Sequence, residues 1–418
     1  MDHVLGFKCS LCGQEYGLSQ VEYVCPKHGD MGNLDVVYDL NKIARRWSRK
    51  KLSQDHDQSI WRYRPLLPLE PDSPVVPLQI GATPLYRPQR LCDALKLPNV
   101  YIKDDGRNPT GSFKDRASSV AVVKARELGS KVITTASTGN AGAALAGMAA
   151  AVGQPAVIFA PMTAPEAKVA QLLMFGATVI LVNGNYDQAF DLCLQASREF
   201  GWYCRNTGYN PFTAEGKKTA ALEICEQMQW KAPDRIFVSV GDGNIISGIH
   251  KGLKDLHALG WIDKLPKLMG VQAAGSAACS NAWRDHTEKI TPVSADTLAD
   301  SISVDLPRDG VRAVRAVSHT GGAYITVTDD EILDAMRVLA RQAAVFAEPA
   351  GATAYAGLAR AIQQHWVEPD ETIVVLITGN GLKDVRSAIK AAGQAHRIEP
   401  TLDKVKELWG KLSAQTAS

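Results

Sequence analysis

An excess of charge of one sign, long apolar runs and internal repeats are all missing from this sequence. Its 46 Lys and Arg residues against 44 Asp and Glu residues leave a formal net charge of +2, so nothing requires nucleic acid or an acidic membrane surface as a partner. No apolar run is long enough to span a bilayer, and the first residues lack the basic-then-apolar pattern of a secretory signal. We therefore expect a cytoplasmic protein with no nucleic-acid or membrane partner.

Cysteine is scarce as well, with 8 residues in a chain of 418, and this usage fits a reducing compartment. Three of the eight lie near the N-terminus, where Cys9 and Cys12 are followed after twelve residues by Cys25 and His28. Two such knuckles suit tetrahedral zinc, which prefers thiolate and imidazole ligands. We interpret residues 1–40 as a zinc-ribbon-like extension whose four protein ligands make the zinc structural. The alternative is two unrelated pairs of residues without a metal.

Hydrophobic residues make up 45% of the chain, which is enough for the cores of about two to three domains. Short apolar segments alternate with helical segments along most of the chain, and this order is typical of parallel sheets with helices on both faces. The predicted strands are 100–103, 132–136, 156–160, 177–182, 236–240, 268–273, 324–328 and 373–377. The predicted helices include 42–51, 116–128, 141–152, 166–175, 186–200 and 329–344. The fold class is therefore α/β.

Residues 108–116 read Asn-Pro-Thr-Gly-Ser-Phe-Lys-Asp-Arg and lie between a predicted strand and a predicted helix. Pro109 and Gly111 interrupt regular structure, so Lys114 is presented at a turn that opens the helix. The backbone N–H groups and the positive end of the helix dipole disfavour its ammonium form. We expect a lowered pKa and a nucleophilic amine. The alternative is an ordinary solvated surface lysine.

Two glycine-containing loops follow predicted strands. Residues 137–140 read Ser-Thr-Gly-Asn at the carboxyl end of a strand, where open α/β sheets bind ligands and a helix N-terminus can hold a carboxylate; the alternative is a simple helix cap. Residues 241–248 read Gly-Asp-Gly-Asn-Ile-Ile-Ser-Gly. They fail the dinucleotide pattern because the third glycine is one place late, and they lack the Lys-Ser/Thr of the Walker pattern. A monophosphate ester fits this loop better, and the alternative is a plain tight turn.

The Lys114 segment resembles the Schiff-base lysine motif of the threonine synthases, which are fold type II pyridoxal phosphate (PLP) enzymes. Residues 137–140, 241–245 and 378–384 (Thr-Gly-Asn-Gly-Leu-Lys-Asp) resemble further motifs of that family in the same order. Threonine synthases also often carry a similar short ribbon, usually with cysteine in the place of His28. The resemblance implies two open parallel-sheet domains with PLP between them, in a chain that forms a homodimer. The large PLP-binding domain would comprise residues 41–110 plus 209–418, and a small mobile domain would comprise residues 111–208.

The resemblance also implies the roles of individual residues. Lys114 would carry the cofactor as a Schiff base and then act as a general base. Asn140 would bond the ring hydroxyl, and Thr378 would bond the pyridine nitrogen and so temper the electron sink. The residues implied to bind the cofactor are Phe113, Lys114, Asn140, Gly241, Asp242, Gly243, Asn244, Ile245 and Thr378. Those implied to bind the amino acid substrate are Ser137, Thr138, Gly139, Asn140, Ala141 and Thr213.

Two positions depart from the family. Threonine synthases typically have arginine where this chain has Thr213, and threonine where it has Ala141. Both family residues face the substrate phosphate, for which a hydroxyl is a poor replacement of a bidentate guanidinium. Lys217 or Lys218 could take over that role, or both could be solvated helix residues. The predicted reaction is O-phosphohomoserine to threonine plus phosphate; the alternative is β-elimination or β-replacement, as in a serine/threonine deaminase or a cysteate synthase.

Overall fold

Two parallel sheets and a small antiparallel one organise the fold in a computed structural model, which describes residues 1–137, 139–164 and 166–416. The strands of the largest sheet are β4 (Leu85–Tyr86), β5 (Val100–Asp104), β10 (Arg235–Ser239), β11 (Lys267–Ala273), β12 (Tyr324–Val327) and β13 (Ile373–Ile377). Their order is β12-β11-β10-β13-β5-β4, and only the β4–β5 pair is antiparallel. Strands β10 and β13 are buried at every position, as apolar strands covered on both faces are.

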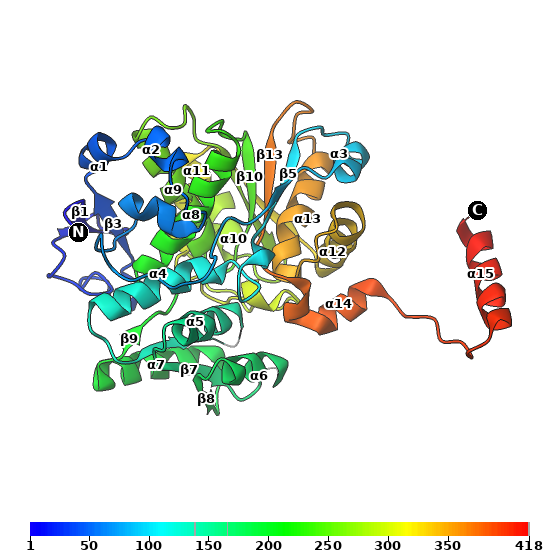
Figure 1. Ribbon diagram of the computed structural model, residues 1–418, viewed down its shortest axis with the longest axis horizontal. Coiled ribbons are helices and arrows are strands. Elements are labelled where there is room, and N and C mark those ends of the chain that lie inside the picture. Colours follow the sequence, from blue (N-terminus) through cyan, green and yellow to red (C-terminus); the bar gives the residue numbers. More distant parts are fainter. Residues whose placement is uncertain (138, 165, 417–418) are drawn as a thin grey trace.

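Helices cover both faces of this sheet (Figure 1). One side carries α8 (Phe212–Gln227), α9 (Asn244–Ala258) and α11 (Gly310–His319). The other side carries α3 (Gln89–Leu95), α12 (Asp329–Ala343) and α13 (Pro349–Gln363), of which α13 packs against β10, β11, β12 and β13. Two shorter helices are α10 (Ala278–Arg284), which packs against α11 and β12, and α14 (Val385–Ala392), which packs against α12. The arrangement confirms the predicted α/β class.

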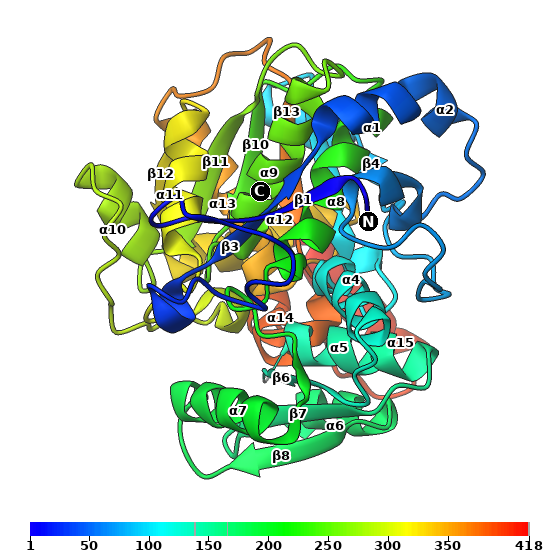
Figure 2. The same ribbon diagram turned by 90° about the vertical axis from the view of Figure 1, so that its left-hand side faces the viewer.

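The second parallel sheet has four strands, β6 (Ile133–Ala136), β7 (Ala156–Pro161), β8 (Thr178–Val182) and β9 (Tyr203–Cys204), in the order β8-β7-β6-β9. Its helices are α5 (Asn140–Ala151), α6 (Glu166–Met174) and α7 (Tyr186–Phe200), and Figure 2 shows this unit below the larger body. All four strands come from residues 133–204, whereas the larger sheet uses strands before and after them. That grouping matches the predicted domains, whose division stays a prediction.

The N-terminal extension is a three-stranded antiparallel sheet of β1 (Val4–Cys9), β2 (Glu15–Tyr16) and β3 (Leu34–Tyr38), in the order β2-β1-β3. Two short helices, α1 (Leu40–Arg46) and α2 (Arg49–Ser53), follow where one helix over 42–51 was predicted. The extension packs against α8, where the ring centroids of Phe7 and Phe212 lie 5.9 Å apart in an edge-on contact. Asn33 also donates a hydrogen bond to Asp309 at 3.2 Å, so the extension is fixed against α8 and α11.

Close helix packing holds α8 in place between α9 and α4 (Lys114–Glu127). A Cβ on Gly216 would collide with the carbonyl oxygen of Arg116, so only glycine allows α8 to lie this close to α4. On the other side, a Cβ on Gly252 would lie 2.6 Å from the carbonyl oxygen of Lys218. The backbone of α8 is therefore fixed relative to the first turn of α4, where Lys114 lies.

A buried network of ion pairs joins β5, α4 and α8. Arg116 donates to Asp105 at 2.6 Å and to Glu223 at 2.9 Å, and Lys103 also donates to Glu223. Burial opposes ionisation of Glu223, but the charges of Arg116 and Lys103 outweigh it and lower the pKa of Glu223 to about 2. Because removal of one partner would leave a buried charge unpaired, this network strongly restricts the start of α4.

The last helix, α15 (Leu402–Thr416), extends away from the rest of the chain at the end of an irregular segment (Figure 1). Its side chains Leu402 and Trp409 are more than two thirds exposed. No helix in the described residues is long and apolar enough to cross a membrane.

Candidate active site

A cavity of about 370 Å³ opens beside Lys114. Its walls come from both parallel sheets, because the residues that follow β6, β10 and β13 all line it. These are the carboxyl ends of parallel strands, where open α/β sheets collect ligand-binding loops. Each of the sequence motifs at 114, 137–140, 241–245 and 378 therefore contributes to one cavity.

The backbone around Lys114 is fixed by hydrogen bonds on both sides. The N–H of Phe113 donates to the carbonyl oxygen of Thr378 at 2.9 Å, and the carboxylate of Asp115 accepts a bond from the N–H of Thr110 at 2.7 Å. Phe113 is fully buried and lies outside the cavity lining, whereas Lys114 and Thr378 line it. Lys114 is thus held at the first turn of α4 with its side chain at the cavity rather than in bulk solvent.

The amine of Lys114 has a lowered pKa, in the direction that the sequence predicted. The cause is mainly burial and then the nearby charge of Arg205, while the carboxylates of Glu348 and Asp242 act in the opposite direction. Burial disfavours the ammonium form because a charge loses its hydration there. The helix dipole, on which the sequence argument rested, is therefore not needed to explain a reactive amine.

The loop after β6 contributes Ser137, Gly139, Asn140 and Ala141 to the cavity wall, while Thr138 lies outside the described residues. Helix α5 begins at Asn140, and no side chain caps it among the described residues. Ser137 accepts a hydrogen bond from the N–H of Gly139 at 3.2 Å, and the alternative of a simple cap stays untested because Thr138 is not described. The first N–H groups of α5 remain available for an anion at the cavity.

The loop after β10 contributes Gly241, Asp242, Gly243, Asn244 and Ile245. Gly243 has a φ of +88°, and a Cβ there would lie 2.7 Å from the carbonyl oxygen of Asp309, so both conformation and space require glycine. Within the part of the chain that the structure describes, no side chain caps α9, which begins at Asn244. Asp242 accepts a bond from the N–H of Arg308 at 3.3 Å, and burial raises its pKa.

The residues present fit a pyridine ring with a phosphate ester, which is what PLP carries. A phosphate can bind to the uncapped N–H groups of α9. The hydroxyl of Ser239, which also lines the cavity, is buried without a hydrogen-bond partner among the described residues. An amine (Lys114), an amide (Asn140) and a hydroxyl (Thr378) line the same space, and these are the groups that an aldehyde, a ring hydroxyl and a ring nitrogen require.

Glu348 is a further residue of the cavity wall. It stands just before α13, accepts a hydrogen bond from the amide of Asn140 at 2.7 Å, and is 4% exposed. Burial raises its pKa to about 7, although Lys114 acts in the opposite direction. Glu348 therefore holds the Asn140 side chain in one orientation.

The structure decides between the two lysines that the sequence left open. Lys217 and Lys218 are both fully buried, so the reading of solvated helix residues is wrong for both. Lys217 lines the cavity, whereas Lys218 pairs with Glu215 at 2.7 Å and Asp255 at 2.8 Å away from it. Thr213 is buried and donates to the carbonyl oxygen of Asn210, and it is not among the residues that line the cavity.

Several further wall residues were missed by the sequence reasoning. Tyr186 and Asp187 open α7, and Thr207 follows β9, all from segments that carry no motif of their own. Arg205 is fully buried, and its charge acts on Lys114. The signal in the sequence was only the short polar stretch 205–207, shortly before Pro211 and the start of α8, and polar residues in a turn usually have a local role.

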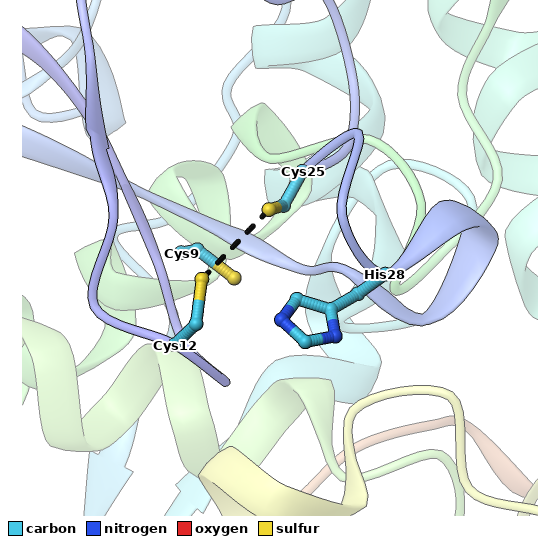
Figure 3. A group of neighbouring side chains, drawn as sticks. All are labelled: Cys9, Cys12, Cys25 and His28. Atoms are coloured by element: carbon cyan, nitrogen blue, oxygen red, sulfur yellow. Dashed lines mark hydrogen bonds between the residues drawn. The ribbon is translucent and has the colours of Figure 1, made fainter.

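The four predicted metal ligands meet in the N-terminal extension (Figure 3). The ligand atoms of Cys9, Cys12, Cys25 and His28 all lie within 4.8 Å of one another, and the sulfur atoms of Cys12 and Cys25 are 4.0 Å apart. Two thiolates on one tetrahedral zinc, each with a bond of about 2.3 Å, would be about 3.8 Å apart. The alternative of two unrelated pairs does not describe this cluster.

The fold and the cavity define a PLP-dependent enzyme, and comparison with known proteins agrees. The family model for pyridoxal-phosphate dependent enzymes matches residues 76–379. Threonine synthases of Methanocaldococcus jannaschii and Methanosarcina acetivorans are each 39% identical over 97% of this chain, covering 99% and 98% of those proteins. The chain belongs to the threonine synthase family, a group of PLP-dependent lyases, as its motifs predicted.

Solved structures are similar in fold at lower identity. Threonine deaminase isoform 2 from Solanum lycopersicum is 23% identical with a TM-score of 0.66, over 83% of this chain and 94% of that one. Maize serine racemase is 23% identical with a TM-score of 0.62, over 81% of this chain and 94% of that one. These similarities confirm the predicted fold type and do not bear on the reaction.

Replacement of Glu348 by Gln is expected to change how stability depends on pH. The pKa of Glu348 is raised from 4.5 to about 7 by burial, so the native state favours the neutral acid. Stability is then present at low pH and is lost as the pH rises from about 4.5 through about 7. Between about pH 4.5 and pH 7, we expect the free energy of unfolding of the cofactor-free wild-type protein to fall by up to about 3 kcal/mol more than that of cofactor-free Glu348→Gln. Urea unfolding at several pH values measures it, and parallel curves for the two proteins would contradict it.

Proposed function

We propose that this chain is a threonine synthase, converting O-phosphohomoserine and water to threonine and phosphate. The observation that carries the proposal is similarity to two archaeal threonine synthases over nearly the whole length of both partners. The cavity supports it, since it joins an amine of lowered pKa to uncapped helix N-termini and buried cations suited to an anionic substrate. In this reaction the bond between Cγ and the ester oxygen breaks, phosphate leaves and Cγ gains a proton. Cβ loses a proton and gains the hydroxyl group of water, so no net oxidation occurs.

PLP, when bound, supplies the electron sink that makes the protons next to the amino group acidic. We assign Lys114 to hold the cofactor and to move the α proton, because its lowered pKa leaves the amine free to accept one. Asn140, oriented by Glu348, is proposed to bond the ring hydroxyl. Thr378 is proposed to bond the ring nitrogen, because it lines the same cavity as Lys114. Its carbonyl oxygen also accepts a hydrogen bond from the N–H of Phe113, the residue before Lys114.

The proposed carboxylate site is the loop after β6. Ser137, Gly139, Asn140 and Ala141 line the cavity, and the uncapped start of α5 supplies N–H donors. Thr138 is assigned with them from the sequence alone. The phosphate of PLP is proposed to bind at residues 241–245, where backbone N–H groups rather than the Asp242 carboxylate face the anion, because that carboxylate accepts from Arg308.

A second candidate reaction is elimination or replacement at Cβ, as in a serine/threonine deaminase or a cysteate synthase. It is favoured by Ala141, whose methyl group lines the cavity where the family typically has a threonine hydroxyl. Thr213 also lies outside the cavity lining, so it does not supply the missing arginine's contact directly. The two reactions differ in product, because elimination at Cβ releases a 2-oxo acid and ammonia.

Purified enzyme is expected to release phosphate and threonine from O-phosphohomoserine in equal amounts. Lys114→Ala should lower the rate at least about 100-fold, since it removes the group that moves the proton, and should abolish the visible absorbance of bound cofactor. Lys131→Ala, at an exposed position, is the matched control and should behave as wild type. A wild-type protein with normal cofactor absorbance that produces only 2-oxo acid from serine or threonine would favour the second candidate instead.

We also propose that Cys9, Cys12, Cys25 and His28 hold one structural zinc ion. The site would brace the extension that packs on α8, and α8 carries Lys217. All four positions around a tetrahedral ion would be occupied by protein, so no open position would remain for chemistry.

Metal analysis of the purified protein is expected to give one zinc per chain. Cys25→Ser should lose the zinc and lower the melting temperature, because zinc binding is coupled to folding of such ribbons. Cys92→Ser is the matched control, since Cys92 is buried but lies outside the cluster, and it should keep the zinc. Full zinc content in Cys25→Ser would contradict the assignment.

Assembly, domain motion and location complete the proposal. We propose that the protein is cytoplasmic and forms a homodimer. The homodimer is proposed because α15 extends away from the rest of its own chain (Figure 1) and has exposed apolar side chains. A monomer in sedimentation at micromolar concentration would contradict the homodimer. The domain of residues 111–208 is proposed to close over the substrate. X-ray scattering that shows no compaction with substrate bound would count against that motion.

A further inference from the structure

Two buried basic residues, Lys217 on α8 and Arg205 directly after β9, have no carboxylate partner among the described residues. The Lys217 amine is fully buried and donates one hydrogen bond, to the amide oxygen of Asn244 at 2.6 Å. The Arg205 guanidinium is also fully buried and donates to the hydroxyls of Ser118 at 3.1 Å and Thr207 at 2.8 Å. Its Nη2 has no hydrogen-bond partner in the described part of the chain.

The neighbouring Lys218 is a buried lysine whose charge is compensated by carboxylates. Lys218 makes ion pairs with Glu215 and Asp255. Lys217 receives no such compensation, and burial together with the charges of Lys114 and Arg205 lowers its pKa well below the ordinary value. Buried charges in proteins are paired with an opposite charge or bind a ligand. Lys217 and Arg205 therefore indicate an anion in the cavity.

The phosphate of PLP does not account for both cations. Its proposed site is the turn 241–245, where the uncapped backbone N–H groups of α9 can bind one phosphate. Lys217 reaches Asn244 at the border of that turn, while Arg205 is bonded to Thr207 on another wall. Thr207 itself lines the cavity. Lys217 and Arg205 together therefore supply more positive charge than the phosphate of PLP requires, and a second anion could bind between Asn244 and Thr207.

The position of Lys217 on α8 explains how it can replace the arginine that the family typically has at position 213. Residues 213 and 217 are four apart, so they lie on one face of the helix, and helical side chains lean toward the N-terminus. Both side chains reach the same atom: the amide oxygen of Asn244 is 3.4 Å from the Thr213 hydroxyl and 2.6 Å from the Lys217 amine. Space for the lysine comes from Gly248, where a Cβ would lie 2.8 Å from the Cβ of Lys217.

We propose that Lys217, assisted by Arg205, binds the leaving phosphate of the substrate in place of the arginine that position 213 lacks. The substrate is then an O-phospho amino acid rather than an O-acetyl or free hydroxy amino acid. This rests on the proposed function for the reaction, and it assigns the phosphate contact to Lys217 rather than to a residue at position 213. The short Thr213 side chain and the long Lys217 side chain act together: the first leaves room, and the second brings the charge.

The test measures binding of inorganic phosphate to the holoenzyme, without turnover. Wild type should bind radiolabelled phosphate in equilibrium dialysis with no amino acid substrate present. Lys217→Gln should weaken that binding about 10-fold to 100-fold, as loss of a charge-assisted hydrogen bond does, with cofactor content unchanged. Lys217→Met serves as a second variant that fills the same space. Lys131→Gln, at an exposed position, should leave phosphate binding unchanged.

A second experiment restores the arginine that the family typically has at position 213. The double variant Thr213→Arg/Lys217→Gln should recover phosphate binding and the KM for O-phosphohomoserine, because the guanidinium returns to the position that relatives of this family use. A purely structural role of Lys217 would not respond to a cation placed at 213, so failure of this rescue in a folded, cofactor-loaded protein would overturn the proposal.

Two other outcomes would also overturn it. If Lys217→Gln loses the cofactor, Lys217 serves the phosphate of PLP instead. If Lys217→Gln binds inorganic phosphate as tightly as wild type, the second anion lies elsewhere. Failure of the proposed reaction is a separate result: it would appear as phosphate binding that depends on Lys217 in a protein that does not convert O-phosphohomoserine.

Discussion

Burial of positive charge around one cavity is the constraint on which the rest of this structure depends. Lys114, Lys217 and Arg205 all have pKa values lowered mainly by burial. Charges removed from water without partners are unfavourable, and the proposed anionic ligands would compensate them. The same physical effect therefore makes the Lys114 amine reactive and prepares the cavity for phosphate groups.

A rigid frame is needed to hold such a cavity open. The ion pairs of Arg116 with Asp105 and Glu223 fix the start of α4 only two residues beyond Lys114. Gly216 lets α8 approach α4 closely, and Gly248 makes room on α9 for Lys217. These contacts join strands and helices that are far apart in the chain, so the amine and the cations keep their places although each one is unfavourable by itself.

Departures from a family motif are better interpreted as a set than one at a time. Thr213 alone suggests a lost phosphate ligand, and Lys217 alone resembles any helical lysine. In the structure both reach the amide oxygen of Asn244, which links the two positions through one contact. Lys218, adjacent in sequence, turns to Glu215 and Asp255 instead. One residue of difference along a helix rotates a side chain by about 100°, which separates a cavity residue from a structural one.

The sequence by itself determined the α/β class, the order of strands and helices, the turn that presents Lys114 and the glycine loop at 241–245. These features follow from local properties: the spacing of apolar residues, the φ that proline fixes and the positive φ that only glycine adopts readily. Only the tertiary structure decided that Glu348 orients Asn140 and that Thr213 lies outside the cavity lining. It also decided that Lys217 and Arg205 are buried without a carboxylate partner among the described residues. The reason is that burial and charge compensation depend on neighbours from distant segments, which no local pattern contains.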